Sequence, residues 1–312
     1  MTTPRVSVVV ATYRRPDRLP GLLAALAAQT LPSDDYEVIV VENASPDDTA
    51  DVLESLRPDF DGTLHVLHME SNAGPAPARN VGITAAAAPV IAFTDDDCLP
   101  EPDWLEAGLR ALEADGVGVA QGRTRPAGPT STFSVTQDID HLTGLYETCN
   151  LFARTDVLRS FGGFDESFGF FGEDTALGWA VRGAGWDAVF VPDAVVRHEV
   201  TEPPFRWHLR RARMYAAFPK LARTVPGFRR EMFWHRLFLR RRSALVFLAV
   251  VGVVAAVPLY GLTLPAVLPW LWHHRGHLRR RQPRAFARVL AFDLTIEWAL
   301  LVGSIRHRTL VL

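Results

Sequence analysis

The chain has 312 residues, a formal net charge of −2, 48% hydrophobic residues and two cysteines, which suits one large α/β domain with an accessory region. Two cysteines are too few for a disulfide framework, and because neither lies in a CxxC pair the sequence also excludes a cysteine-rich zinc site. Both facts favour a reducing compartment. The apolar run that ends at Ala11 is too short for a signal-peptide core. We therefore expect the N-terminal region to remain in the cytosol.

Apolar, β-branched runs alternate with helical patterns over the first two hundred residues, which is typical of βαβ units around a mainly parallel sheet. The predicted strands are residues 6–10, 38–41, 64–67, 90–93 and 186–191. The predicted helices are residues 19–28, 48–56, 76–88, 102–114 and 173–183. The stretch 122–169 has no regular pattern, and we expect it to face an acceptor rather than to build the core.

Three adjacent acids, Asp95, Asp96 and Asp97, directly follow the fourth predicted strand. The carboxyl ends of strands are where open α/β sheets bind ligands. Adjacent carboxylates repel one another, and a divalent cation that bridges them to substrate phosphates would offset this repulsion. Taken alone, the cluster favours a solvated acidic turn, because such acidic tripeptides are common by chance.

Four ordered segments carry a family resemblance: residues 8–15 (VVVATYRR), 40–45 (VVENAS), 72–80 (NAGPAPARN) and the acid cluster. Together with the glycine-rich pieces that lead to Glu173, they resemble the inverting family 2 glycosyltransferases of GT-A fold, over about residues 5 to 200. The resemblance implies an α/β nucleotide-sugar-binding domain, a nucleoside-diphosphate sugar as donor, and Mn²⁺ or Mg²⁺ as cofactor.

The resemblance also implies roles for individual residues. Those expected to hold the nucleotide and its diphosphate are Thr12, Tyr13, Arg14, Glu42, Asn43, Arg79, Asn80, Asp95 and Asp96. The expected metal ligands are Asp97, Asp95 and His198. Glu42 stands where many relatives carry Asp. An imidazole ligand favours manganese over magnesium, although His198 is also compatible with an ordinary histidine at a strand end.

A second acidic pair, Glu173 and Asp174, lies at the predicted start of a helix. The helix dipole favours acids there and would keep the Asp174 carboxylate ionised. An ionised carboxylate near the donor's anomeric carbon can accept a proton from the attacking hydroxyl. The resemblance makes Asp174 the inverting base, with Glu173 as its catalytic neighbour, while ordinary helix-start chemistry is the alternative interpretation.

The charges are divided unevenly along the chain. Residues 1–204 hold 13 Lys and Arg against 32 Asp and Glu, a net −19, whereas residues 205–312 hold 20 against 3, a net +17. We therefore predict a catalytic domain over 1–204 and a basic, apolar, helical region over 205–312 with an anionic partner. Residues 243–272 carry no formal charge, which favours a membrane over nucleic acid as that partner.

Proline positions predict how the uncharged stretch is arranged. Pro258, Pro265 and Pro269 would permit two short helices in a hairpin, with arginines flanking both ends. Residues 286–305 predict an amphipathic helix, because Asp293 and Glu297 make a lipid-spanning segment costly. Two true membrane spans and a helical lid without membrane contact remain as alternatives.

These observations predict a metal-assisted, inverting glycosyltransferase at the cytoplasmic face of the cell membrane, either membrane-associated or membrane-inserted. Its acceptor would be a hydroxyl of a lipid-linked or cell-envelope glycan, with no nucleic-acid partner. A nucleotidyltransferase of related fold would share the nucleotide and metal sites without needing Asp174. A non-catalytic membrane-bound scaffold is the third alternative.

Overall fold

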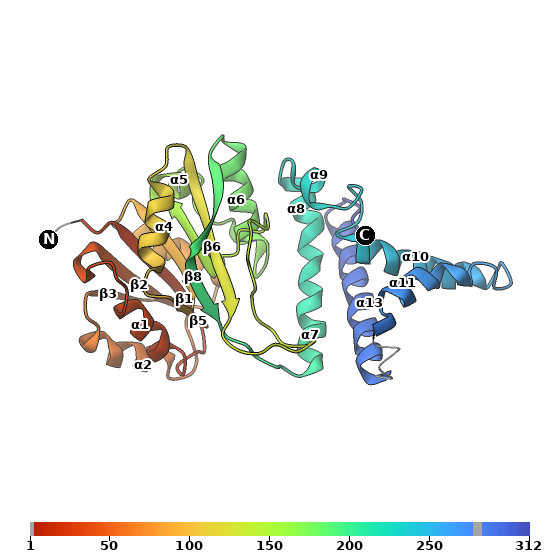
Figure 1. The fold of residues 1–312 in the computed structure, drawn as a ribbon, viewed down its shortest axis with the longest axis horizontal. Coiled ribbons are helices and arrows are strands. Elements are labelled where there is room, and N and C mark those ends of the chain that lie inside the picture. Colours follow the sequence, from red (N-terminus) through yellow and green to blue (C-terminus); the bar gives the residue numbers. More distant parts are fainter. Residues whose placement is uncertain (1–2, 277–282) are drawn as a thin grey trace. The chain divides into compact units, whose positions relative to one another are not determined.

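The structure is a computed structural model that describes residues 3–276 and 283–312. The chain divides into two compact units, Met1–Glu202 and Pro203–Leu312 (Figure 1). The division falls where the sequence becomes arginine-rich.

The first unit is built on one eight-stranded sheet with strand order β3-β2-β1-β4-β7-β6-β8-β5. The strands are β1 (Val6–Thr12), β2 (Tyr36–Glu42), β3 (Thr63–His68), β4 (Val90–Asp95), β5 (Cys98–Pro100), β6 (Val117–Pro126), β7 (Asn150–Arg154) and β8 (Asp187–His198). Neighbours β1–β2, β2–β3, β1–β4 and β6–β8 are parallel, whereas β4–β7, β6–β7 and β5–β8 are antiparallel.

The sheet is therefore mixed, and the prediction of a mainly parallel sheet misses the three antiparallel pairs among its seven pairs of neighbours. The antiparallel strand β7 comes from the stretch that the sequence pattern left irregular. Its first residue, Asn150, is fully buried and accepts a hydrogen bond from Trp104 Nε1 at 2.8 Å while donating to two backbone carbonyls. A strand that begins in a buried polar network gives no apolar alternation to detect.

Helices cover both faces of the sheet. They are α1 (Leu19–Ala27), α2 (Thr49–Leu56), α3 (Pro75–Ala85), α4 (Trp104–Leu112), α5 (Thr155–Ser160) and α6 (Glu173–Gly183). Short 3-10 turns occur at η1 (Ser33–Asp35), η2 (Arg57–Asp59) and η3 (Glu166–Phe168). Val8 and Val10 of β1 share one core with Leu22 of α1 and residues of α4.

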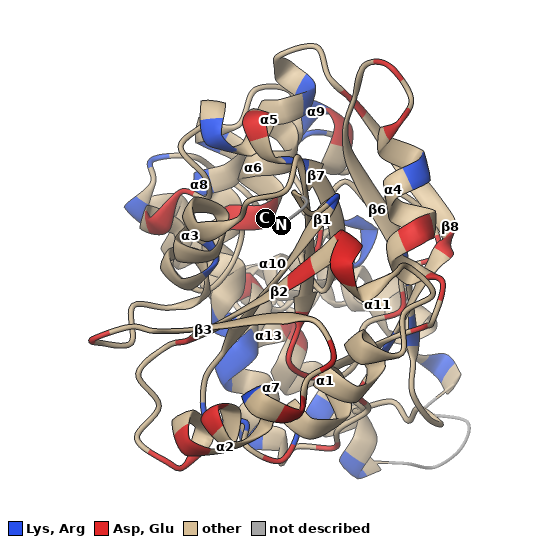
Figure 2. Cartoon of the chain, turned by 90° about the vertical axis from the view of Figure 1, so that its left-hand side faces the viewer, with Lys and Arg blue, Asp and Glu red and all other residues tan. Residues whose placement is uncertain are grey.

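The alternate residue Val9 points to the other face, against α3. A Cβ built on Gly82 of α3 would lie 2.3 Å from Val9 Cγ1, so only glycine permits this close packing. Acidic residues lie on the outer helices of this unit, such as Asp51 on α2 and Glu106 on α4 (Figure 2). They contribute to its strongly negative charge.

Strand register sets the position of the candidate site. Thr12 at the end of β1 is paired with Glu42 at the end of β2, and Ala11 is paired with Asp95 at the end of β4. Because these three strands are parallel, their carboxyl ends meet at one edge of the sheet. The predicted motifs are thereby gathered into one place although up to 84 residues separate them in sequence.

The second unit is helical. Its elements are α7 (Phe205–Ala212), η4 (Arg213–Ala217), α8 (Phe218–Thr224), α9 (Phe228–Met232), α10 (Arg241–Ala256), η5 (Leu264–Val267), α11 (Leu268–His273) and α13 (Pro283–Arg306). Helix α13 packs tightly on η4, where a Cβ on Gly303 would lie 2.3 Å from the Ala216 carbonyl oxygen. Helix α10 and the η5–α11 segment lie side by side as a hairpin, as the proline positions predicted (Figure 1).

Across residues 3–276 and 283–312, we find no helix with both the length and the apolar character needed to cross a membrane. Helix α10 has only 16 residues, and the 24 residues of α13 include Asp293 and Glu297. The alternative of two membrane spans is therefore wrong for the described helices. The fold itself supports a helical C-terminal region without showing what that region contacts.

Candidate active site

A cavity of about 280 Å³ opens at the carboxyl ends of β1, β2 and β4. It is lined by Ala11, Thr12, Tyr13, Arg15, Asn43, Asn72, Gly74, Pro75, Arg79, Asp95, Asp96, Asp97 and Phe170. Most of the predicted nucleotide-binding residues are thus brought together, while Arg14, Glu42 and Asn80 are not among the lining residues.

The end of β1 is tied to the acid cluster. Thr12 Oγ1 donates to Asp96 Oδ2 at 2.8 Å, and Arg15 Nε lies 3.8 Å from Asp96 Oδ1. Burial, with a further contribution from the charge of Asp97, raises the pKa of Asp96 to about 7. Asp96 is therefore held by the protein, and its proton is retained more readily than that of an exposed aspartate.

Of the adjacent pair Arg14 and Arg15, it is Arg15 and not the predicted Arg14 that lines the cavity with Arg79. Arg14 adopts a left-handed backbone conformation (φ 57°), and its N–H donates to Ser45 Oγ at 3.0 Å. This turn brings Tyr13 and Arg15 to the lining. Nothing in the sequence pair Arg14-Arg15 distinguishes the two, because the choice depends on the backbone conformation of the turn.

Glu42 and Asn43 organise the loops around the cavity. Buried Glu42 accepts the N–H of Ser45 at 2.6 Å and lies 3.5 Å from His68 Nδ1. Asn43 Nδ2 donates to the Gly74 carbonyl at 2.9 Å, and its Oδ1 accepts the Ala73 N–H at 3.2 Å. The Asn43 side chain therefore fixes the loop from which α3 begins. Of the two, only Asn43 lines the cavity.

Arg79 of α3 joins the two acid sites. Its side chain is buried, with Nη2 2.9 Å from Asp95 Oδ1 and Nη1 3.1 Å from Glu173 Oε1. Burial alone would lower the pKa of the guanidinium, but the nearby Asp95 and Glu173 charges outweigh burial and raise it. The expected phosphate-facing arginine is thus also a bridge between carboxylates that are 78 residues apart in sequence.

The structure does not bring Asn80 to the cavity. Its Nδ2 donates to the Phe164 carbonyl and its Oδ1 accepts the Phe164 N–H at 2.8 Å. A second donation reaches Glu166 Oε1 at 3.0 Å. Because both ends of the amide are used by the loop that precedes α6, Asn80 holds that loop and the prediction that it contacts the nucleotide is not supported.

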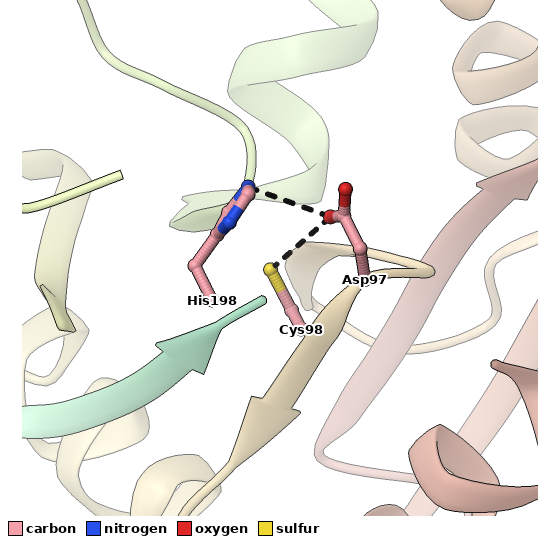
Figure 3. A group of neighbouring side chains, drawn as sticks. All are labelled: Asp97, Cys98 and His198. Atoms are coloured by element: carbon pink, nitrogen blue, oxygen red, sulfur yellow. Dashed lines mark hydrogen bonds and ion pairs between the residues drawn. The ribbon is translucent and has the colours of Figure 1, made fainter. Parts of the chain in front are cut away.

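Asp97, Cys98 and His198 form a compact group in which one potential ligand atom of each lies within 4.8 Å of the others. Figure 3 shows the three side chains converging, with His198 Nε2 3.5 Å and Cys98 Sγ 3.9 Å from Asp97 Oδ1. Antiparallel pairing of Cys98 on β5 with His198 on β8 produces this juxtaposition. His198 Nδ1 lies 2.9 Å from the Glu199 carbonyl oxygen, which orients the ring.

The donor set of this group fits a divalent cation such as Mn²⁺. A carboxylate oxygen and an imidazole nitrogen are suitable ligands for such a cation. Burial, together with the charge of Asp95, raises the pKa of Asp97, and a bound cation would stabilise the ionised carboxylate that this environment disfavours. Burial raises the pKa of the Cys98 thiol well above its usual value. Asp97 and His198 are therefore the stronger candidates, and Asp95, which pairs with Arg79, contributes charge from one side.

Asp174 lies in the first turn of α6, where its Oδ1 accepts the Thr175 N–H at 2.6 Å. Burial, reinforced by the adjacent charge of Glu173, raises its pKa well above the usual value. Burial therefore acts against the ionised form of this carboxylate, whereas the helix dipole was expected to favour it. A raised pKa makes the ionised form a stronger proton acceptor.

Comparison with known proteins decides the family. A sequence model described as "Glycosyl transferase family 2" matches residues 7–171, more than half of the chain, and one described as "Glycosyl transferase family group 2" matches residues 90–274. Glycosyltransferase AglE of Haloferax volcanii is 30% identical over 271 residues, covering 83% of this chain and 84% of AglE. The chain belongs to glycosyltransferase family 2. This membership favours a glycosyltransferase over the nucleotidyltransferase and scaffold alternatives.

Other relatives and solved structures are consistent with this family 2 glycosyltransferase. Succinoglycan biosynthesis protein ExoM of Rhizobium meliloti is 31% identical over 215 residues, covering 64% of this chain and 68% of ExoM. Mannosyltransferase PcManGT from Pyrobaculum calidifontis, solved with GDP-Man and Mn²⁺, aligns with TM-score 0.61 at 20% identity, covering 99% and 88% of the two chains. S. aureus TarS 1-349 with UDP-GlcNAc aligns with TM-score 0.53 at 18% identity, covering 98% and 92%. At these identities the structures show a shared GT-A-type fold.

The cavity also contains residues that the sequence motifs did not assign. Arg15, Asn72, Pro75 and Phe170 line it, and Cys98 joins the candidate metal group. Asn72 and Pro75 lie inside the third quoted segment, so the motif itself was their signal. Phe170 lies in the loop before α6, and no local pattern distinguishes it.

Proposed function

We propose that this family 2 glycosyltransferase transfers a sugar, with inversion at the anomeric carbon, from a nucleoside-diphosphate donor to a hydroxyl of a lipid-linked or cell-envelope glycan. The observation that carries the proposal is the joining of two acid sites through Arg79, one at the strand ends and one at the start of α6. The relative ExoM, named for succinoglycan biosynthesis, and the donor complexes of PcManGT and TarS support the substrate classes.

Different residues would bind the nucleotide and the diphosphate of the donor. Tyr13, Arg15 and Asn43 are placed to contact the nucleotide, since they line the cavity from two adjacent strand ends. Asp97 and His198 are the residues that would hold a divalent cation, which when bound supplies Lewis-acid stabilisation of the diphosphate leaving group.

Asp174 is the proposed general base. The acceptor oxygen forms a bond to the anomeric carbon as the bond from that carbon to the diphosphate oxygen breaks, and Asp174 takes the hydroxyl proton. Glu173 does not share this step, because its carboxylate is buried against Arg79. One displacement at the carbon gives inversion, without a carboxylate nucleophile.

The test is a donor screen with the full chain over UDP-, GDP- and dTDP-sugars, with Mn²⁺, Mg²⁺ or EDTA, read as nucleoside-diphosphate release and as product anomeric configuration by NMR. We expect Asp174→Asn to lower kcat by about 10²- to 10⁴-fold. Asp156→Asn is a matched control, because Asp156 at the start of α5 also accepts the next residue's N–H, at 2.8 Å, and belongs to neither of the acid sites that Arg79 joins. Retention of configuration, or an active Asp174→Asn variant, would contradict the mechanism.

We also propose that the second unit attaches the enzyme to the cytoplasmic face of the cell membrane. The α10–α11 hairpin exposes large apolar side chains, including Val254 at 68%, Val257 at 83% and Leu262 at 81%. Residues 205–312 carry a net charge of +17, which favours an anionic surface. These features support attachment through the hairpin without a membrane-crossing helix.

A further inference from the structure

The α10–α11 hairpin contains a groove of about 950 Å³, far larger than the cavity at the strand ends. Its apolar wall consists of Leu245, Pro265, Leu268, Pro269, Leu271 and Trp272. Its basic residues are Arg241, Arg242, His273 and Arg275. A volume near the upper end of the roughly 300–1,000 Å³ typical of small-molecule sites suits one elongated ligand.

A buried ionic cluster fixes the open end of the hairpin. Asp293 of α13 is 3% exposed; its carboxylate is ion-paired with Arg242 at the start of α10 and lies 3.4 Å from His274 Nε2 after α11. Trp270 Nε1 donates to the same carboxylate at 3.1 Å. Since both hairpin ends are joined to one side chain of α13, the walls of the groove are held in place independently of any ligand.

Two arginines of the groove have charges that the protein does not neutralise. Arg241 and Arg275 are exposed, and within residues 3–276 and 283–312 neither forms an ion pair with a carboxylate. Residues 205–312 contain only three acids, of which Asp293 already pairs with Arg242. Arg275 also stacks over the Trp272 ring at 4.7 Å, which pre-orients its guanidinium.

The polar and apolar parts of the groove follow the hairpin axis. Arg241 begins α10 and Arg275 follows α11, so both lie at the open end of the hairpin, whereas the chain reverses through the apolar, exposed residues 257–262. An amphiphile with its anionic group at the arginines would extend its chain along the groove toward that apolar turn. This is the order of charge and hydrocarbon found at a membrane surface.

We propose that this groove binds one single-chain lipid phosphate, with the phosphate between Arg241 and Arg275 and the hydrocarbon chain against Leu245, Leu268 and Trp272. Guanidinium groups bind phosphate through paired, charge-assisted hydrogen bonds, and the apolar wall excludes water from the chain. The groove would bind the lipid part of the acceptor. This proposal rests on the proposed function, in which the acceptor is lipid-linked.

The test measures binding of farnesyl monophosphate to the full chain by isothermal titration calorimetry. We expect Arg241→Gln/Arg275→Gln to weaken binding by at least about tenfold through loss of the phosphate contacts. Leu268→Asp, at a position 60% exposed and therefore tolerant of substitution, should weaken it similarly. Arg306→Gln on α13 and Val254→Asp, both exposed and outside the groove, are matched controls that should bind as the parent chain does.

Three further ligands test whether the groove needs a phosphate and a hydrocarbon chain in one molecule. Farnesol or inorganic phosphate binding as tightly as farnesyl monophosphate would overturn the proposal, because either result removes the need for the joined phosphate and chain. Phosphatidylglycerol vesicles that displace farnesyl monophosphate would also overturn it, since the groove would then hold a bilayer lipid. Donor hydrolysis without acceptor, read as nucleoside-diphosphate release, should be unchanged in the groove variants. Absence of that release in every variant would instead count against the proposed function.

Discussion

Replacing Arg79 should destabilise the catalytic unit more than any comparable change at its surface. Arg79→Met leaves Glu173 buried without its cation, and breaking a buried pair from one side costs about 3–5 kcal/mol. For a unit of this size, about 2–4 °C is lost per kcal/mol, so the unfolding midpoint should fall by about 10 °C. Arg110→Met removes an exposed arginine 4.0 Å from Glu106 and should cost under about 0.5 kcal/mol.

The assay is differential scanning calorimetry of the full chain, with the catalytic unit's transition assigned by its upward shift in Mn²⁺ and nucleoside diphosphate. A double-mutant cycle measures the interaction between Arg79 and Glu173 directly. Glu173→Gln removes the charge that Arg79 compensates, so the variant with both changes should be more stable than the sum of the single effects, by about 2 kcal/mol. If Arg79→Met lowers the midpoint no more than Arg110→Met does, the buried bridge does not stabilise this unit.

Four further outcomes follow from the site and the second unit. Because the raised pKa of Asp174 must be exceeded before this residue can accept a proton, kcat should fall on the acid side at a pH above that of an ordinary aspartate, and an unshifted acid limb would contradict the assignment. His198→Ala should weaken Mn²⁺ binding, measured by electron paramagnetic resonance of the free ion, by at least about tenfold, and unchanged binding would remove His198 from the metal site. Burial raises the pKa of Glu297 to about 7, so the folded protein binds the extra proton and stability should decline as pH rises from about 4.5 to 7. Since solvent screens part of this effect, Glu297→Gln should add about 1–2 kcal/mol at pH 8 and little at pH 4 in urea unfolding, and equal effects at both pH values would refute it. Val254→Glu/Leu262→Glu should abolish co-sedimentation of the chain with anionic vesicles, and retained binding would place the attachment elsewhere.

Local sequence patterns were sufficient for the parallel strands β1 to β4. Strands β1, β2 and β4 are continuous β-branched or apolar runs buried on both faces, and the acids that follow β4 were placed correctly at the strand ends. Strand β7 was missed because its burial depends on Asn150, whose hydrogen bonds reach residues 27 to 46 positions away. No periodicity records a polar network of that range.

The same limit applies to the site. Cys98 joined Asp97 and His198 only because β5 pairs with β8, 100 residues later in the chain, and a three-residue strand gives no detectable pattern. Asn80 shows the converse. Its motif position suggested nucleotide contact, but the side chain is used to hold the 164–166 loop. A motif locates the neighbourhood of a residue, whereas the direction of its side chain depends on packing.

The arrangement of Glu173 and Asp174 explains why two adjacent acids have different roles. Helix α6 begins at Glu173, and successive residues of a helix point in different directions, so only Glu173 reaches Arg79. Its charge then acts on Asp174 and raises the pKa of that base, while Arg79 also holds Asp95 at the strand ends. We therefore propose that Glu173 is a positioning residue and not a catalytic partner. Glu173→Gln should therefore shift the acid limb of kcat to lower pH while retaining turnover, whereas Asp174→Asn should lower kcat strongly at every pH. Loss of turnover in Glu173→Gln across the whole pH range would return Glu173 to the catalytic role.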